Sequence, residues 1–142
     1  MKPSIWLRAA SILTLFHAIL HTAGGMFGSP RNAVQSAARS VVQSLHFDAF
    51  GSYRSYWDFY FGFGLVTSVT LLLSAALLWQ LASLVKTDSA KARPFLAMLF
   101  LAFIAIAVIS WIYFFAPPFV FEIAIATCIG VAFVLAGKGN SG

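Results

Sequence analysis

The chain has 142 residues, of which 61% are hydrophobic and 9% are charged, and its formal net charge is +5. A soluble globular domain is about 45–50% apolar and about 25% charged, so this chain lacks the polar side chains that would cover a surface facing water. Its apolar content excludes a disordered chain, and its single cysteine excludes an internal disulfide. The composition indicates a protein whose partner is the lipid bilayer, not nucleic acid.

Four stretches are long and apolar enough to cross a bilayer, which takes about 20 mostly apolar residues. Residues 9–30, 59–85 and 94–121 contain no Lys, Arg, Asp or Glu, and Pro117-Pro118 interrupts the last of them. The predicted fold class is all-α, an integral membrane four-helix bundle forming a single domain, residues 1–142. The spans are predicted at about residues 5–26, 54–85, 94–115 and 119–137.

The basic residues predict the orientation, because Lys and Arg in short connections are retained on the cytoplasmic side. With four spans, six of the nine basic residues share one side: Lys2, Arg8, Lys86, Lys91, Arg93 and Lys138. We therefore expect a multi-pass protein of the bacterial inner (cytoplasmic) membrane with both termini in the cytoplasm. Tryptophan prefers the headgroup level, so Trp6 and Trp79 are predicted at the inner boundary, and Trp57 and Trp111 at the outer one.

One long connection, residues 27–52, joins the first two spans on the outer side. Ser29-Pro30 is typical of a helix start, and apolar residues then recur at helical spacing over about residues 30–45. This pattern predicts an amphipathic helix lying on the outer membrane surface. A partly ordered loop is the alternative.

The few ionisable residues near the spans are the main functional signal, because charge at bilayer depth is costly. His17 and His21 are four residues apart and are expected to share a helix face. The topology places Asp58 and Glu122 at the same outer level as His21. These four residues are the candidate catalytic groups, for proton transfer in an outward-facing pocket inside the bundle.

Aromatic residues cluster at the same outer level. The candidate ligand-binding residues are Tyr53, Arg54, Tyr56, Trp57, Tyr60, Trp111 and Tyr113. Two alternatives stay open: the aromatic side chains form an interfacial belt, and Arg54 with Asp58 is a structural ion pair along the second helix. Gly62 and Gly64 leave room for a neighbouring backbone or a ligand.

A metal site is only weakly indicated. His17, His21, Asp58 and Glu122 are acceptable ligand types for zinc or iron, but the Glu-x2-His pairs of di-iron bundles are absent. We therefore predict no metal, and no cofactor is identified. Cys128 lies among Ala and Ile, where an inert buried thiol is expected.

Two segments carry a resemblance to known proteins: residues 21–25 (HTAGG) and 54–64 (RSYWDFYFGFG). With them the chain resembles a family of small bacterial four-span inner-membrane proteins without an assigned activity. Its layout is more loosely similar to the DoxX-like and the emopamil-binding, sterol-isomerase-like membrane bundles. The latter resemblance implies protonation of lipophilic substrates by His and carboxylate groups, at the level of fold analogy alone.

Two functional hypotheses follow. The first is a protein that binds a lipophilic small molecule in an outer-leaflet polar pocket, with His17 as the deepest polar group, so that His17→Ala abolishes ligand retention. The second is a non-catalytic accessory or assembly subunit, in a homo-oligomer or a membrane complex, whose polar residues hold helices and partners together.

Overall fold

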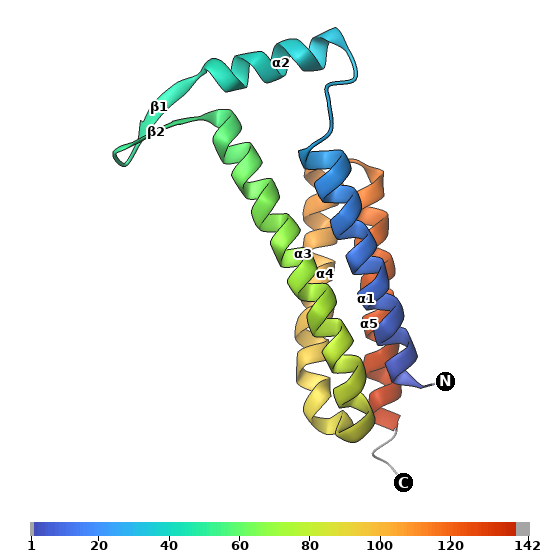
Figure 1. The fold of residues 1–142 in the computed structure, drawn as a ribbon. Helices are drawn as coiled ribbons and strands as arrows, with labels where there is room; N and C mark the ends of the chain where they lie inside the picture. The colour runs from blue at the N-terminus through green and yellow to red at the C-terminus, as the bar shows by residue number, and fades with distance from the viewer. Residues whose placement is uncertain (1, 139–142) are drawn as a thin grey trace. The chain divides into compact units, whose positions relative to one another are not determined.

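The computed structural model describes residues 2–138. In chain order the elements are α1 (Pro3–Leu20), the π-helix η1 (His21–Met26), α2 (Ala33–Ser44), β1 (His46–Ala49), β2 (Ser52–Ser55), α3 (Tyr56–Thr87), α4 (Ser89–Tyr113) and α5 (Ala116–Lys138) (Figure 1). Four segments are long and apolar enough to cross a membrane: Pro3–Met26, Tyr56–Thr87, Ser89–Tyr113 and Ala116–Gly137. The predicted all-helical architecture with four spanning-length helices is confirmed.

The start of α4 differs from the prediction, which placed it at about residue 94. Asp88 caps the helix, since its carboxylate accepts a 3.0 Å hydrogen bond from the backbone N–H of Lys91. This backbone hydrogen bond, followed by the side-chain interaction with Lys91, holds the pKa of the Asp88 carboxyl below its ordinary value. The cap starts α4 at Ser89, and Pro94 lies within the helix.

The start of α5 also differs, because the helix begins at Ala116 and not at Phe119. Pro117 and Pro118 therefore occupy the first turn of α5. The first four N–H groups of a helix have no acceptor within it, so a proline costs no hydrogen bond at these positions. The chain changes helix near the double proline as predicted, but both prolines belong to the second helix, α5.

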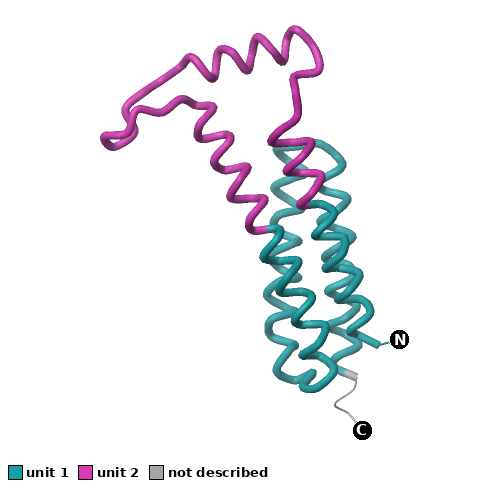
Figure 2. Tube along the Cα trace, in the orientation of Figure 1, with its two compact units in different colours: residues 1–17, 71–142 teal, residues 18–70 magenta. Residues whose placement is uncertain are grey.

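The chain divides into two compact units (Figure 2). Unit 1 comprises residues 1–17 and 71–142, and unit 2 comprises residues 18–70. Unit 1 is a bundle of α4 and α5 with the first part of α1 and the second part of α3. Its largest fully buried side chains are Leu7, Leu78, Leu96, Ile125, Ile129 and Thr14. Leucine and isoleucine from all four helices thus form one continuous core.

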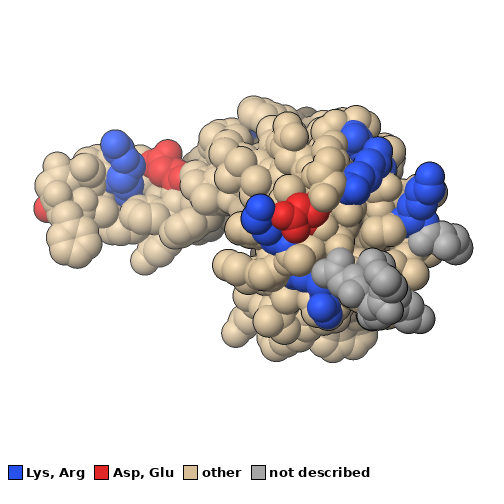
Figure 3. Space-filling view, turned by 90° about the horizontal axis from the view of Figure 1, so that it is seen from below, with Lys and Arg blue, Asp and Glu red and all other residues tan. Residues whose placement is uncertain are grey.

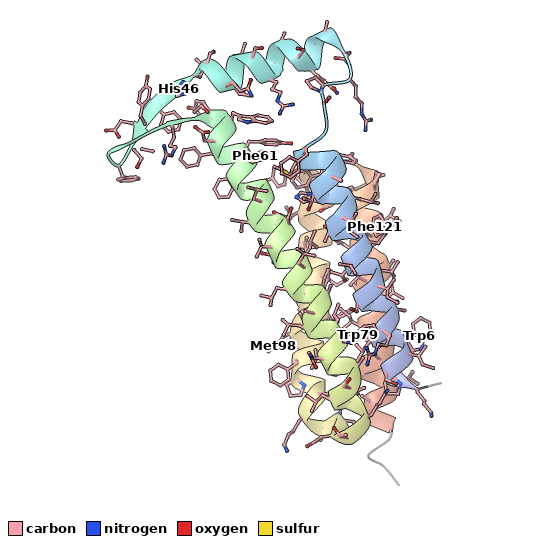
Figure 4. All side chains as sticks on the ribbon, viewed as in Figure 1. Trp6, His46, Phe61, Trp79, Met98 and Phe121 are labelled. Atoms are coloured by element: carbon pink, nitrogen blue, oxygen red, sulfur yellow. The ribbon has the colours of Figure 1, made fainter. Side chains whose placement is uncertain are left out.

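One end of unit 1 is basic. The start of α1, the end of α3 and the start of α4 meet there, and Figure 3 shows Lys and Arg side chains gathered on this end. The Arg8 guanidinium carbon lies 3.4 Å from the centroid of the Trp79 ring, and its NH2 group donates to the Ser83 hydroxyl at 3.2 Å. Trp6 and Trp79 both lie toward this end (Figure 4), which agrees with their predicted common level.

Unit 2 contains the predicted helix of the outer connection, α2, but the cap is Asn32 and not Ser29. Asn32 has an extended backbone, and its side chain accepts a hydrogen bond from Gln35 N at 2.9 Å. No residue of α2 is buried. The Arg39 guanidinium carbon lies 4.3 Å from the centroid of the Trp57 ring, so α2 turns a polar face toward α3. The apolar residues Val34 and Val41 are 78% and 54% exposed.

An antiparallel β-hairpin follows α2, and the sequence did not predict it. Its pairs run from His46 opposite Ser55 to Ala49 opposite Ser52. The turn between the strands has φ of +52° at Phe50 and +81° at Gly51. Two residues with positive φ are typical of a type I′ hairpin turn, whose usual sequence is Asn-Gly or Asp-Gly. Phe50 breaks that rule, which explains why the turn was missed.

Candidate functional site

The four candidate catalytic residues are divided between the two units. His17 and Glu122 belong to unit 1, and His21 and Asp58 belong to unit 2. The predicted shared face of His17 and His21 rests on α-helical geometry, but α1 ends at Leu20 and His21 begins the π-helix η1. The structure therefore gives each unit its own set of polar groups.

His17 lies in the interior of unit 1, with 6% of its surface exposed. Its ring stacks on that of Phe121 of α5, with the centroids 5.1 Å apart and an interplanar angle of 15°. Figure 4 labels Phe121 on α5. Thr14, one turn earlier on α1, is fully buried and donates to the carbonyl of Ala10 at 2.8 Å. Thr14 and His17 of α1 are thus packed inside the bundle of unit 1.

Glu122 follows Phe121 and is 4% exposed. Ser110 of α4, which is 3% exposed, lies close to its carboxyl. The second oxygen, Oε2, is buried and has no hydrogen-bond partner within residues 2–138. Ser110 was not a candidate in the sequence, because one serine in an apolar helix carries no distinctive signal.

His21 has a structural contact in unit 2. Its Nε2 lies 3.1 Å from the carbonyl oxygen of Gly64 on α3. A carbonyl only accepts hydrogen bonds, so Nε2 carries the proton in this contact. The hydroxyls of Thr22 and Ser68 lie 2.9 Å apart beside it. Together these contacts form a polar seam between η1 and α3, which is how helices in a membrane hold one another.

Gly64 also accommodates Met26 of η1. A side chain at Gly64 would overlap the end of the Met26 side chain, which is 3% exposed. The sequence analysis expected a neighbouring backbone or a ligand at this glycine, and the structure places a side chain there. Gly62, by contrast, has no atom within 4 Å of the position that a Cβ would take.

Asp58 and Arg54 do not form the predicted ion pair. Asp58 Oδ2 accepts hydrogen bonds from the N–H of Ser55 at 2.7 Å and from its hydroxyl at 3.0 Å. Arg54 lies in β2 and donates to the carbonyl of Tyr53 at 3.1 Å. The prediction fails because α3 begins at Tyr56, which leaves Arg54 outside the helix.

Arg54 and Asp58 instead line one end of an open groove of about 340 Å³ on a face of α3 in unit 2. Its other lining residues are Phe59, Gly62, Phe63 and Val66. Sequence reasoning missed Phe59, Phe63 and Val66 as site residues. The available signal was helical spacing, since Asp58, Gly62 and Val66 follow at intervals of four, as do Phe59 and Phe63. The groove thus has a charged end, a glycine floor and apolar walls.

The candidate aromatic residues are divided between the two units. Three ring pairs lie in unit 2. Tyr53 stacks on His46 with the ring centroids 5.2 Å apart. The ring centroids of Tyr56 and Phe47 are 4.8 Å apart, and those of Trp57 and Tyr60 are 5.3 Å apart. Trp111 and Tyr113 belong to unit 1, where they are 68% and 75% exposed. Of the seven candidate ligand-binding residues, Arg54 alone lines the groove.

The part of the chain that the structure describes contains no group of three His, Cys, Asp or Glu side chains placed to hold a metal ion. Cys128 is 8% exposed and is a free thiol in the core of unit 1.

Comparisons with protein-family models, with curated proteins and with solved structures give no match. The resemblance to small four-span bacterial proteins therefore stays a prediction.

Proposed function

We propose that the chain is a multi-pass protein of the bacterial inner membrane, with both termini in the cytoplasm, that binds a lipophilic small molecule near the outer leaflet. The observation that supports this proposal is the groove on α3. Its charged end and apolar length match an amphiphile, which has one polar head and one apolar chain. A groove of about 340 Å³ lies in the usual size range of small-molecule sites.

The charges at the groove indicate the head group. The Arg54 guanidinium is exposed and forms no ion pair within the described chain, so it is available to a phosphate or a carboxylate. Asp58 is occupied by Ser55 through Oδ2. Its other oxygen suits an ammonium group. Phe59, Phe63 and Val66 then provide apolar contacts for the first part of an acyl chain. A single-chain phospholipid fits this arrangement.

Native mass spectrometry of the protein after gentle extraction tests the proposal, with lysophosphatidylethanolamine as the added probe. Wild-type protein is expected to retain one probe molecule. Gly62→Leu fills the floor of the groove and is expected to abolish retention, while Arg54→Gln is expected to weaken it about tenfold, the effect of losing roughly 1.4 kcal/mol from one charge-assisted contact.

The matched control is Ala76→Leu, which adds the same side chain at another exposed position of α3, outside the groove. It is expected to leave retention unchanged. The proposal fails if Gly62→Leu and Ala76→Leu retain the probe equally. It also fails if His17→Ala abolishes retention while Gly62→Leu does not, because the binding site would then lie in unit 1.

An accessory or assembly subunit is the second candidate function, and α2 favours it. This helix has no buried residue, turns Arg39 toward Trp57, and leaves Val34 and Val41 exposed. An uncovered apolar helix face suits a protein partner or a second copy. The same native spectra would then show a larger complex that dissociates in the Val34→Ser, Val41→Ser double variant. A monomer in gentle extraction contradicts this candidate.

A further inference from the structure

Arg8 of α1 is held against α3 at the basic end of unit 1, where Figure 4 labels Trp79. The guanidinium carbon of Arg8 lies 3.4 Å from the centroid of the Trp79 ring, and its NH2 group donates to the Ser83 hydroxyl at 3.2 Å. Its NH1 group is buried and has no acceptor within residues 2–138. An aromatic ring and a hydroxyl orient a guanidinium, but they carry no negative charge to balance it.

The acidic residues of unit 1 lie elsewhere. They are Asp88 and Glu122. Asp88 caps α4, and its Oδ2 lies 2.9 Å from the ammonium nitrogen of Lys91. Glu122 lies near the start of α5, and α5 begins at the end of the bundle opposite to the start of α4 (Figure 1). Within unit 1 the charge of Arg8 therefore has no carboxylate beside it, and an anion from outside the chain is expected there.

The face of α3 beside Arg8 changes from apolar to cationic toward the basic end. Its exposed residues are, in order, Leu72, Trp79, Ser83 and Lys86. They follow at intervals of seven, four and three residues, so they share one helix face. On α1 the exposed Ile12 follows Arg8 by one turn. An apolar stretch, a ring, a hydroxyl and a cation thus succeed one another as the acyl chain and the phosphate of a phospholipid require.

We propose that this seam between α1 and α3 binds an anionic phospholipid. The NH2 group of Arg8 and the Lys86 ammonium attract the phosphate. The Ser83 oxygen accepts from Arg8, so its own proton can be donated to a phosphate oxygen. Ile12 and Leu72 provide apolar contacts for an acyl chain.

The seam and the groove of unit 2 select different lipids. The groove has a carboxylate at its charged end, which suits an ammonium group, whereas the acidic side chains of unit 1 lie away from the seam. The seam therefore favours a headgroup with net negative charge, such as phosphatidylglycerol. This inference rests on the proposed membrane location and not on ligand binding in the groove.

Native mass spectrometry of the full protein in mild detergent, with added dioleoylphosphatidylglycerol, tests the proposal. Wild-type protein is expected to retain the lipid, and Arg8→Gln is expected to weaken retention about tenfold or more by removing a charge-assisted contact. The matched control is Lys91→Gln, which removes an equal charge from the same end, where the ammonium already pairs with Asp88. It is expected to change retention by less than about twofold. Equal losses in both variants would show that total charge attracts the lipid, and would overturn the proposal.

A second variant keeps the test valid if Arg8→Gln does not fold. Lys86 is exposed, so Lys86→Gln removes a charge from the seam without disturbing the core. It is expected to weaken retention about fivefold. Retention equal to that of wild type in Lys86→Gln contradicts the proposed headgroup contact.

Two further ligands identify what the seam recognises. Dioleoylphosphatidylcholine has the same acyl chains without net charge and is expected to be retained much more weakly, so equal retention of the two lipids would overturn the preference for an anion. Inorganic phosphate in excess has no acyl chain and is not expected to displace dioleoylphosphatidylglycerol. Displacement would assign the seam to a free anion and overturn the lipid proposal.

Gly62→Leu separates this inference from the proposed function. It fills the groove of unit 2 and is expected to retain dioleoylphosphatidylglycerol as wild type does. Loss of that lipid in Gly62→Leu would place it in unit 2 and overturn this inference. Unchanged retention of lysophosphatidylethanolamine in the same variant would overturn the proposed function alone.

Discussion

The two units differ in how they are held together. Unit 1 buries large apolar side chains from four helices, and Leu7, Leu78, Leu96 and Ile129 have no exposed surface. Unit 2 depends on polar contacts, such as the His21 to Gly64 hydrogen bond, and its helix α2 has no buried residue. The contrast indicates that unit 1 is the more tightly packed part and that unit 2 opens more easily.

Removing a core side chain from unit 1 is expected to have the largest effect. Leu78→Ala leaves a cavity in a fully buried site and is expected to lower the free energy of unfolding by about 2 kcal/mol or more. Val41→Ala in α2 removes an exposed side chain and is expected to change it by less than about 0.5 kcal/mol. Unfolding in a mild detergent by titration with a denaturing one measures both. Equal losses would remove the distinction between the units.

The hairpin of unit 2 is expected to gain stability from a change at its turn. Phe50 has φ of +52°, a left-handed conformation that costs a bulky residue roughly 1 kcal/mol and that Asn adopts readily. Phe50→Asn creates the Asn-Gly sequence favoured in type I′ turns. Slower amide exchange in β1 and β2 would show the gain. Faster exchange would mean that the exposed Phe50 ring stabilises the hairpin through a contact outside the described chain.

Two neighbouring glycines of α3 give a matched and smaller comparison. Alanine favours a helix over glycine by up to about 1 kcal/mol. Gly62→Ala has open space and is expected to realise that gain, whereas Gly64→Ala forces the end of Met26 to move and is expected to gain less or nothing. Equal gains, measured by unfolding, would mean that Met26 does not pack against Gly64.

The smallest expected effect is the pH response of the Asp88 cap in unit 1. Its folded pKa lies below the unfolded value, so the cap stabilises α4 fully above the unfolded pKa and is lost as the pH falls through the folded one. The amide signal of Lys91 reports this loss in acid. Asp88→Asn keeps a capping side chain without a titrating group, so its Lys91 signal should not respond. A response in both proteins would assign the titration to another residue.

The four helices of spanning length could be predicted from the gaps between charged residues, because charge at bilayer depth is energetically costly. Helix ends were less predictable. They depend on individual hydrogen bonds, such as the capping of α4 by Asp88, and on the tolerance of a first turn for Pro117 and Pro118. Each shifted a boundary by a few residues.

The candidate site was predicted only in part. Glu122 was recognised as a carboxyl within an apolar helix, and its burial follows from the same reasoning. The predicted pairing of Arg54 with Asp58 failed because it assumed that the helix begins two residues earlier than it does. Ser110 was not recognised because serine is common in apolar helices. The groove was missed because its walls, Phe59 and Phe63, are indistinguishable in sequence from lipid-facing phenylalanines.

The central claim is that a lipophilic ligand binds on unit 2 and not in the packed interior of unit 1. Photocrosslinking tests it most directly, with a single-chain phospholipid that carries a diazirine in its acyl chain and mass spectrometry to locate the labelled residues. We expect labels concentrated at Phe59, Phe63 and Val66, and we expect these labels to be lost in Gly62→Leu. Labels concentrated around Phe121 and Ser110, or spread evenly over every exposed helix face, would contradict it.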